Sequence, residues 1–120
     1  MDGHEIGSPR RGEIWLVSLE PVIGYEIGKT RPALIISNDS NNQYADTVTV
    51  LPITSKTKKI YPFDTFLPKE ETKLAKESKV KCNQIRTIDK KRLIKFINKI
   101  SDQTLKEVEQ ALLIHLDISS

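Results

Sequence analysis

Short runs of β-branched, aliphatic and aromatic residues alternate with polar turns along this chain, a pattern that predicts a series of strands. Six such runs cover residues 13–19, 33–36, 47–53, 62–67, 80–88 and 94–100. Residues 37–42 read SNDSNN, a dense turn signal, so we expect a hairpin between the second and third runs. Pro52 requires the third run to lie at a sheet edge or to end near that residue. We expect Trp15, in the first run, to lie in the core.

A longer period replaces the strand pattern near the C-terminus. Ser101 is a suitable helix N-cap with Asp102 in the first turn, and apolar residues then recur at spacings of three and four, at Leu105, Val108, Leu112 and Leu116. The charged connection over residues 69–79 has room for a turn of helix. Short strands followed by one amphipathic helix predict an α+β domain, mainly β, with a curled antiparallel sheet covered on one side by that helix.

Composition limits the domain organisation and the cell compartment. The 120 residues, 38% of them hydrophobic, suit a single domain over residues 12–120. Residues 1–11 lack apolar periodicity and contain several Gly, Ser and Pro residues, so we expect a disordered N-terminal tail. Cys82 is the single cysteine, and the sequence shows no signal peptide or long apolar span, which favours the cytoplasm.

The charge pattern favours a polyanionic partner. Nineteen Lys and Arg residues against 16 acids give a formal net charge of +3, a modest excess that many soluble proteins share. The distribution is more informative than the total, because the basic residues gather in two clusters, Lys56, Lys58 and Lys59, and Lys90, Lys91, Arg92 and Lys95.

Histidine and metal chemistry find little support in this sequence. His4 lies in the predicted tail, and His115 lies near the helix end, where a solvated or capping role is expected. The sequence has no CxxC pair, no HExxH and no aspartate cluster with metal-ligand spacing, so we expect no metal or cofactor. Residues 28–30 read GKT, but the upstream glycine spacing does not fit a phosphate-binding loop and no helix is predicted to follow.

The loop over residues 24–31 brings several charged side chains close to a strand. Glu26 and Lys29 lie in this loop, and Arg31 comes directly before Pro32, which favours an extended conformation for the arginine. If the sheet curls, Thr54, Gln84 and Arg86 can converge on Arg31. Arginine donors and a threonine hydroxyl can hold a phosphodiester, and a carboxylate can accept a proton. The simpler interpretation, solvated arginines and a Glu26–Lys29 pair, stays open at this point.

Four separated blocks of this sequence resemble the MazF/PemK toxin family. They read RRGEIWLVSLEP over residues 10–21, GYEIGKTRPALIISND over 24–39, TVTVLPIT over 47–54 and NQIRTIDKKRL over 83–93. The resemblance implies an SH3-like small barrel of about six antiparallel strands (MazF/PemK/CcdB-like) with a C-terminal helix, assembled as a homodimer. It also implies a toxin of a type II toxin–antitoxin system, an mRNA interferase that cleaves single-stranded RNA at short motifs without metal or ribosome. Its implied partner is an antitoxin with an acidic disordered tail.

Site residues follow from matching the family motifs position by position. The catalytic arginine and threonine of the family fall on Arg31 and Thr54, and the loop glutamate falls on Glu26, which either helps to activate the 2′-hydroxyl or shapes the site. The base-contacting glutamine falls on Gln84. With it we expect the remaining RNA-binding residues to be Tyr25, Lys29, Ser55, Lys56, Asn83 and Arg86.

Three positions depart from the family pattern and concern recognition more than cleavage. Tyr25 and Ile27 replace a small polar residue and a glutamine, and Asn83 replaces an acid. Tyr25 either stacks on an RNA base or packs over the base of the loop. The resemblance therefore implies the reaction class but does not specify the cut motif.

The reaction expected for this family member is attack by the 2′-hydroxyl on its own phosphate, which leaves a 2′,3′-cyclic phosphate and a 5′-hydroxyl. The first alternative is a barrel toxin that poisons gyrase without nuclease activity. That activity depends on a tryptophan-containing C-terminal end, whereas this chain ends in LDISS and its only tryptophan is Trp15. The second is a non-catalytic RNA-binding module, which the presence of both Arg31 and Thr54 disfavours.

Overall fold

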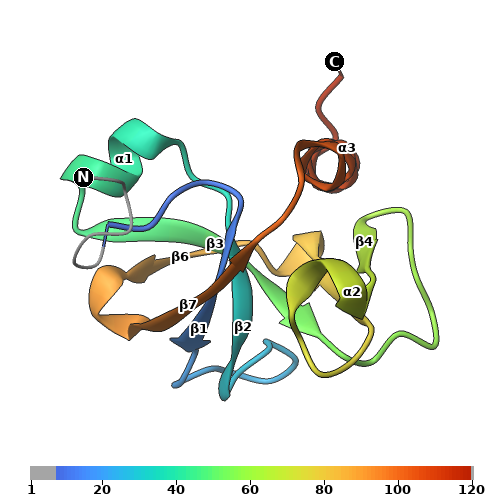
Figure 1. Ribbon diagram of the computed structural model, residues 1–120, viewed down its shortest axis with the longest axis horizontal. Coiled ribbons are helices and arrows are strands. Elements are labelled where there is room, and N and C mark those ends of the chain that lie inside the picture. The colour runs from blue at the N-terminus through green and yellow to red at the C-terminus, as the bar shows by residue number, and fades with distance from the viewer. Residues whose placement is uncertain (1–7, 120) are drawn as a thin grey trace.

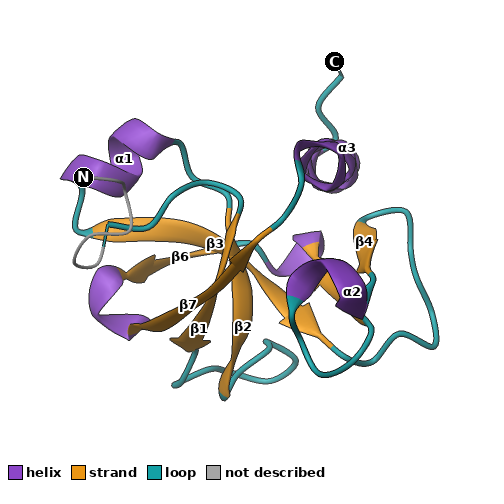
Figure 2. Cartoon of the chain, viewed as in Figure 1, coloured by secondary structure: helices purple, strands orange, loops and turns teal. Residues whose placement is uncertain are grey.

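A strongly curled antiparallel sheet dominates the computed structural model, which describes residues 8–119 (Figures 1 and 2). Its seven strands within the described range pair in the order β4-β5-β3-β2-β1-β7, and β6 pairs with β3 outside this path. The elements are β1 (Glu13–Ser18), β2 (Thr30–Ile35), α1 (Asp39–Tyr44), β3 (Thr47–Thr54), β4 (Asp64–Leu67), α2 (Lys69–Thr72), β5 (Ser78–Lys81), the 3₁₀ turn η1 (Cys82–Gln84), β6 (Arg86–Asp89), the 3₁₀ turn η2 (Lys90–Arg92), β7 (Leu93–Lys99) and α3 (Asp102–Leu116).

Strand β3 is central to the sheet and pairs with three other strands. Its residues 50–52 pair with β2, residues 47–50 with β6 and residues 53–54 with β5. Pro52 therefore lies opposite Ala33 of β2, while on the other side β6 has ended and β5 has not begun. Strand β3 is not a sheet edge, but it ends at Thr54, two residues after Pro52, which is the second of the two expected arrangements. The gap between two partners also tolerates the missing N–H.

Two segments differ from the sequence prediction, one because of side-chain capping and the other because of strand pairing. The turn expected at 37–42 contains the helix α1, whose N-cap Asn38 accepts a hydrogen bond from Asn41 N at 2.8 Å, although β2 and β3 do pair antiparallel as expected. The strand expected over 80–88 divides into β5, η1 and β6, which pair with different parts of β3. This division raises the strand count from the expected six to seven in the described range.

The core consists of two clusters on the opposite faces of the curled sheet. Ile14, Leu34 and Leu51 belong to a cluster that includes Val108 and Ala111 of α3, whereas alternate residues such as Trp15 and Val50 belong to the other. Strands β1, β2 and β3 thus bury both faces. The expected burial of Trp15 is confirmed, because only 7% of it is exposed. Polar chemistry is consequently confined to the ends of these strands and to the loops that leave them.

Helix α3 covers one side of the sheet near β4, as Figure 1 shows. The predicted N-cap is confirmed, since Ser101 Oγ accepts a hydrogen bond from Thr104 N at 3.1 Å. Glu71 of α2 also holds this helix start, because its carboxylate accepts hydrogen bonds from Ser101 N and Thr104 Oγ1 at 2.9 Å each. Burial alone would raise the pKa of Glu71, but these hydrogen bonds lower it below its usual value. Leu116, predicted on the apolar face, is 45% exposed.

The N-terminal tail expected over residues 1–11 falls largely on residues 1–7, which lie outside the described residues. Within the described range, Arg11 contacts two helices of the domain. Its backbone N donates to Asp39 Oδ1 at 2.7 Å, and its Nη2 lies 2.6 Å from Glu109 Oε2. None of the helices in residues 8–119 is long and apolar enough to span a membrane.

Candidate functional site

The site lies where β2 and β3 diverge into their loops. The last pair of their register on the side of these loops is Ala33 with Pro52, and Arg31 and Thr54 lie two residues beyond this pair on the two strands. Both residues line a cavity of about 500 Å³, which we call the cationic cavity, and a second cavity of about 410 Å³, which we call the neighbouring cavity. Arg31 and Thr54 thus stand together in the wall that the two cavities share.

The cationic cavity carries an excess of positive charge. Five basic residues line it, against two acids, Glu20 and Glu26; the bases are Lys29, Arg31, Lys56, Lys79 and Lys81. The neighbouring cavity has aliphatic walls as well, from Pro32, Ile53 and Leu74. A polyanion suits the first cavity, and the flat face of a ring suits the second.

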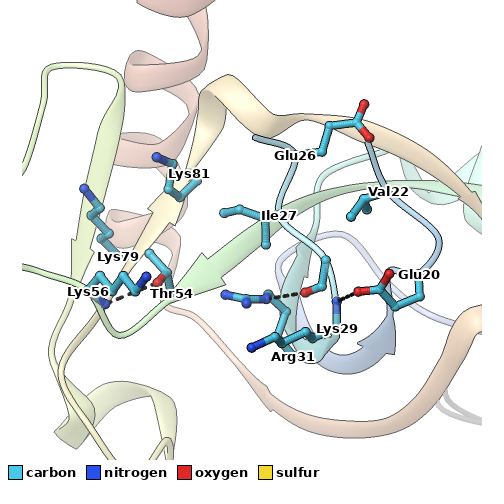
Figure 3. Close-up of a pocket in the computed structure, with 11 residues that line it drawn as sticks. Glu20, Val22, Glu26, Ile27, Lys29, Arg31, Thr54, Lys56, Lys79 and Lys81 are labelled. Carbon is cyan, nitrogen blue, oxygen red and sulfur yellow. Dashed lines mark hydrogen bonds between the residues drawn. The ribbon is translucent and has the colours of Figure 1, made fainter. Parts of the chain in front are cut away.

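Arg31 is held by the loop that precedes it. Its Nε donates to Gly28 O at 2.8 Å, which leaves both terminal nitrogens of the guanidinium available to a ligand. Figure 3 shows the guanidinium turned toward Thr54. Arg31 lies inside β2 rather than at the end of the loop, paired with Val17 of β1, so the strand fixes its backbone. The expected restriction of this arginine is therefore stronger than Pro32 alone would give.

Thr54 is the last residue of β3 and is held by the loop that follows it. Its hydroxyl oxygen accepts a hydrogen bond from Lys56 N at 3.2 Å, and only 8% of the residue is exposed. Since the hydroxyl accepts in this bond, its hydrogen can be donated to a phosphate oxygen in the cavity. Ser55 and Lys56, the next two residues, are exposed and line the neighbouring cavity, and Lys56 also lines the cationic cavity.

The loop between β1 and β2 is organised by two carboxylates. Glu20 Oε1 accepts a hydrogen bond from the backbone N of Lys29 at 2.5 Å, and Lys29 has a left-handed backbone with φ +66°. Glu26 Oε1 accepts from Ile23 N at 2.7 Å near the loop tip. Although Glu26 lines the cationic cavity, Figure 3 shows its carboxylate turned away from Arg31 and Thr54. Glu20, which sequence reasoning missed, closes the turn that carries Gly28 O to Arg31.

Residues from η1 and β6 hold the β1–β2 loop by hydrogen bonds. Gln84 Oε1 accepts a hydrogen bond from Ile27 N at 3.3 Å, and Arg86 Nη1 donates to Leu19 O at 3.0 Å. Both residues, together with Asn83, line a third cavity of about 380 Å³ that also touches Glu26 and Ile27. The fold therefore brings these three predicted RNA-binding residues next to the cationic cavity, and Gln84 and Arg86 use part of their hydrogen-bonding capacity to hold the loop.

Tyr25 stands apart from the other predicted site residues. Its relative exposure is 101%, so it does not pack over the base of the loop, which was one of the two expected arrangements. Ile23, also at the loop tip, is 83% exposed. An aromatic ring held at the tip of a loop in this way is available to stack on an unpaired base.

Two cavity residues that sequence reasoning missed are Lys79 and Lys81 of β5. The alternation in SKVKC carries the signal, because Val80 and Cys82 belong to the core cluster and the lysines must face the other way. Burial raises the pKa of the Cys82 thiol to about 12, with a further contribution from nearby Asp64, so this cysteine is not a nucleophile at neutral pH. Across residues 8–119 no group of three or more His, Cys, Asp or Glu side chains is arranged to hold a metal ion.

Comparison with known proteins places this geometry in a family. The PemK-like, MazF-like toxins of type II toxin–antitoxin systems match residues 10–116. Endoribonuclease MazF9 of Mycobacterium tuberculosis (strain ATCC 25618 / H37Rv) is 40% identical over 116 residues, which cover 92% of this chain and 98% of that protein.

Solved structures agree with the sequence match. The crystal structure of MazF (Form-I) from Deinococcus radiodurans has a TM-score of 0.80 at 28% identity and covers 92% of this chain and 98% of that chain. MazE-MazF (Form-II) from the same organism has a TM-score of 0.75 at 27% identity and covers 93% and 98%. These neighbours confirm the expected barrel fold with a C-terminal helix. The chain belongs to the PemK/MazF family of toxins of type II toxin–antitoxin systems.

Proposed function

We propose that this protein is a sequence-specific endoribonuclease that cleaves single-stranded RNA at the wall shared by the two cavities. The observation that carries the proposal is that Arg31 and Thr54 line the same two cavities, with donors from both side chains available at a cavity rich in lysine. The name of the relative MazF9, an endoribonuclease, supports the same reaction class.

The reaction is an in-line attack of a 2′-hydroxyl on the adjacent phosphate, so the substrate supplies its own nucleophile. The 2′-oxygen loses its proton and bonds to phosphorus, while the 5′-oxygen leaves and takes up a proton, giving a 2′,3′-cyclic phosphate and a 5′-hydroxyl. Arg31 stabilises the charge that develops on the non-bridging oxygens and assists proton delivery, and Thr54 orients the phosphate. These roles need preorganised side chains, and β2 fixes the backbone of Arg31 while β3 fixes that of Thr54.

Glu26 has two candidate roles, general base and loop shaping, and the geometry favours the second. As a general base it must reach the 2′-hydroxyl within hydrogen-bonding distance, whereas its carboxylate now closes the loop tip through Ile23 N. We assign Glu26 to loop shaping, with the base role as the alternative that its substitution tests. Glu20 has the corresponding shaping role at the other end of the loop, through Lys29 N.

Two cavities on either side of the reacting phosphate provide places for the flanking nucleosides. Lys29 and Lys56 can pair with neighbouring phosphates in the cationic cavity. The neighbouring cavity, which Ser55 lines beside aliphatic side chains, suits a base. Asn83, Gln84 and Arg86 present polar groups beside the loop for base edges, and Tyr25 supplies a stacking face. We assign the choice of cut motif to this second set.

The partners and the compartment follow from the same proposal. We propose a cytoplasmic homodimer inhibited by an antitoxin whose acidic disordered tail occupies the cationic cavity. Support comes from the Deinococcus radiodurans MazE-MazF structure and from an endoribonuclease solved in complex with its cognate antitoxin, which resembles this chain with a TM-score of 0.76.

The test is incubation of the purified protein with a long single-stranded RNA in excess chelator, followed by mapping of both new ends. The expected result is cleavage at a short recurring motif that leaves cyclic phosphates, with Arg31→Ala inactive. Arg10→Ala serves as the matched control, because Arg10 is exposed and lines none of the three cavities described above. Intact RNA together with impaired gyrase would overturn the proposal in favour of a gyrase poison.

A further inference from the structure

We propose that Lys79 is a positioning residue: its buried pair with Asp64 fixes the basic loop over residues 55–63, which carries Lys56 along the substrate path. The effect on RNA rests on the proposed function, whereas the effect on the loop does not. Lys79 lines the cationic cavity, so the obvious alternative is that it binds a phosphate directly.

The contacts of Lys79 decide between these two roles. Its Nζ lies 2.9 Å from Asp64 Oδ2 and 2.6 Å from Lys59 O, and it stands 5.4 Å from the centroid of the Tyr61 ring. Two of the three ammonium hydrogens therefore have hydrogen-bond acceptors, and the Tyr61 ring adds a cation–π contact. Only 5% of Lys79 and 7% of Asp64 is exposed, and their charges cancel locally, so Lys79 adds little attraction for RNA.

All three partners of Lys79 belong to the far end of the loop or to the strand that follows it. Asp64, the first residue of β4, also accepts a hydrogen bond from Tyr61 N at 2.9 Å through the same oxygen. The Tyr61 ring stacks on Phe63 with centroids 5.3 Å apart. Lys79 and Asp64 therefore immobilise the segment from Lys59 to Phe63.

The near end of the loop is tied to Thr54. Lys56 N donates to the Thr54 hydroxyl, and Thr54 is itself the cross-strand neighbour of Lys79 in the β3–β5 ladder. The loop thus begins after Thr54, which is proposed to bind the phosphate, and its far end is bonded to Lys79, the cross-strand neighbour of Thr54 (Figure 3). Loosening the far end would release Lys56 from its place beside Thr54 and would disturb the hydroxyl as well.

Substitution of Asp64 distinguishes a purely electrostatic effect on RNA binding from an effect through the loop. The substitution Asp64→Asn removes a negative charge near a phosphate site, and by charge alone it would strengthen RNA binding. If Lys79 acts by holding the loop, the same substitution weakens the bond that fixes it, so the KM for RNA rises. The conservative change keeps an oxygen that can still accept from Tyr61 N.

The loop itself is tested first, on the free protein, by the rate of tryptic cleavage after Lys58 and Lys59, two exposed residues of the loop. The variants are Lys79→Met and the double variant Lys79→Met/Asp64→Leu, since replacing both partners avoids a lone buried charge if the single variant does not fold. We expect cleavage to accelerate on the order of tenfold, equivalent to 1.4 kcal/mol. Lys81→Met, on the same face of β5, is the control and should leave this rate unchanged.

Folding is monitored in the same samples by alkylation of Cys82, which is buried in the native core and reacts only on unfolding. Equal tryptic rates in folded wild-type and folded double variant would overturn the inference, whatever the protein does to RNA. Faster cleavage with a protected Cys82 supports it.

The second experiment measures cleavage by the Asp64→Asn variant of an RNA that contains one copy of the cut motif. We expect KM to rise on the order of tenfold while kcat changes less, and the loss to be non-additive with Lys56→Met, because both changes act through the same loop. An unchanged or lower KM would overturn the positioning role. Absence of cleavage by the wild-type protein would instead refute the proposed function and leave the tryptic result to judge the loop.

Discussion

The two loops that flank the site are held by different kinds of contact. The β1–β2 loop, residues 19–29, is held at its base by neutral carbonyls and exposed carboxylates: Arg92 Nη1 donates to Ser18 O and Glu20 O, Arg86 to Leu19 O, and Lys29 N to Glu20. The β3–β4 loop, residues 55–63, is held by the buried pair of Lys79 and Asp64. The Lys79–Asp64 pair of the second loop is buried, whereas the contacts of the first loop are partly buried or exposed.

Each loop also holds one of the two residues proposed for chemistry. Arg31 donates to Gly28 O of the first loop, and Thr54 accepts from Lys56 N of the second. Exposed hydrogen bonds open more easily than buried ion pairs, so we infer that the first loop moves to admit RNA while the second stays in place. The tip of the first loop, with Ile23 and Tyr25 exposed, is then the part that closes on the substrate.

The largest effect is expected at the shared wall itself. Arg31→Ala removes preorganised donors aimed at developing charge and should lower kcat by about 100- to 1,000-fold. Since Arg31 is only half-buried and its backbone lies within β2, the fold should persist. Single-turnover cleavage measures the first effect and circular dichroism the second; substantial residual cleavage would remove Arg31 from its role.

A smaller effect should follow from loosening the first loop at Gly28. A Cβ at this position would lie 2.4 Å from Glu20 Oε1 and 2.8 Å from Val22 Cγ2, so Gly28→Ala must push the Glu20 carboxylate away from Lys29 N. Because Glu20 holds the turn at Lys29, this movement also displaces Gly28 O from Arg31 Nε. We expect the displacement to lower kcat by about 10- to 100-fold.

The matched control for Gly28 is Gly24→Ala in the same loop. Gly24 has φ +56° but nothing within 4 Å of an added Cβ, so the change strains the tip without touching Arg31. We expect cleavage close to wild type in this variant. If the two alanine variants lose activity equally, general loop strain and not the Gly28–Arg31 contact would be responsible.

The smallest effect is expected for Glu26→Gln. The amide oxygen can still accept from Ile23 N, so a loop-shaping glutamate should lose less than about tenfold in kcat, whereas a general base typically contributes 100- to 10,000-fold. The pH dependence of kcat/KM gives a second readout. A fall in kcat of about 100- to 10,000-fold, together with loss of the decline of kcat/KM on the acidic side, would establish Glu26 as the base.

Local chemistry made part of this structure predictable. Ser101 capped a helix, Trp15 entered the core and Pro32 marked Arg31 as restrained, because each depends on neighbours within a few residues. The α1 helix and the division of the 80–88 run were missed, because turn-forming side chains can cap a short helix and because partner strands, not propensity, end β5.

The predicted site residues split along the same line. Arg31 and Thr54 line the same cavities because each lies two residues beyond the last pair, Ala33 with Pro52, of a hairpin that the sequence predicted. The pairing of Lys79 with Asp64, 15 residues away, and the bond between Glu20 and Lys29 depend on how loops return to the sheet, which no local pattern specifies. The exposure of Tyr25 likewise became visible only with the path of its loop.

The most direct test of the account uses two synthetic RNAs that contain the mapped motif and differ by one oxygen. One is all-ribose and the other has a single 2′-deoxy nucleotide immediately before the cut. We predict that the first RNA is cleaved in excess chelator to a 2′,3′-cyclic phosphate and a 5′-hydroxyl, and that the second stays intact while still competing for the protein. Cleavage of the deoxy-substituted RNA at the same bond would contradict it.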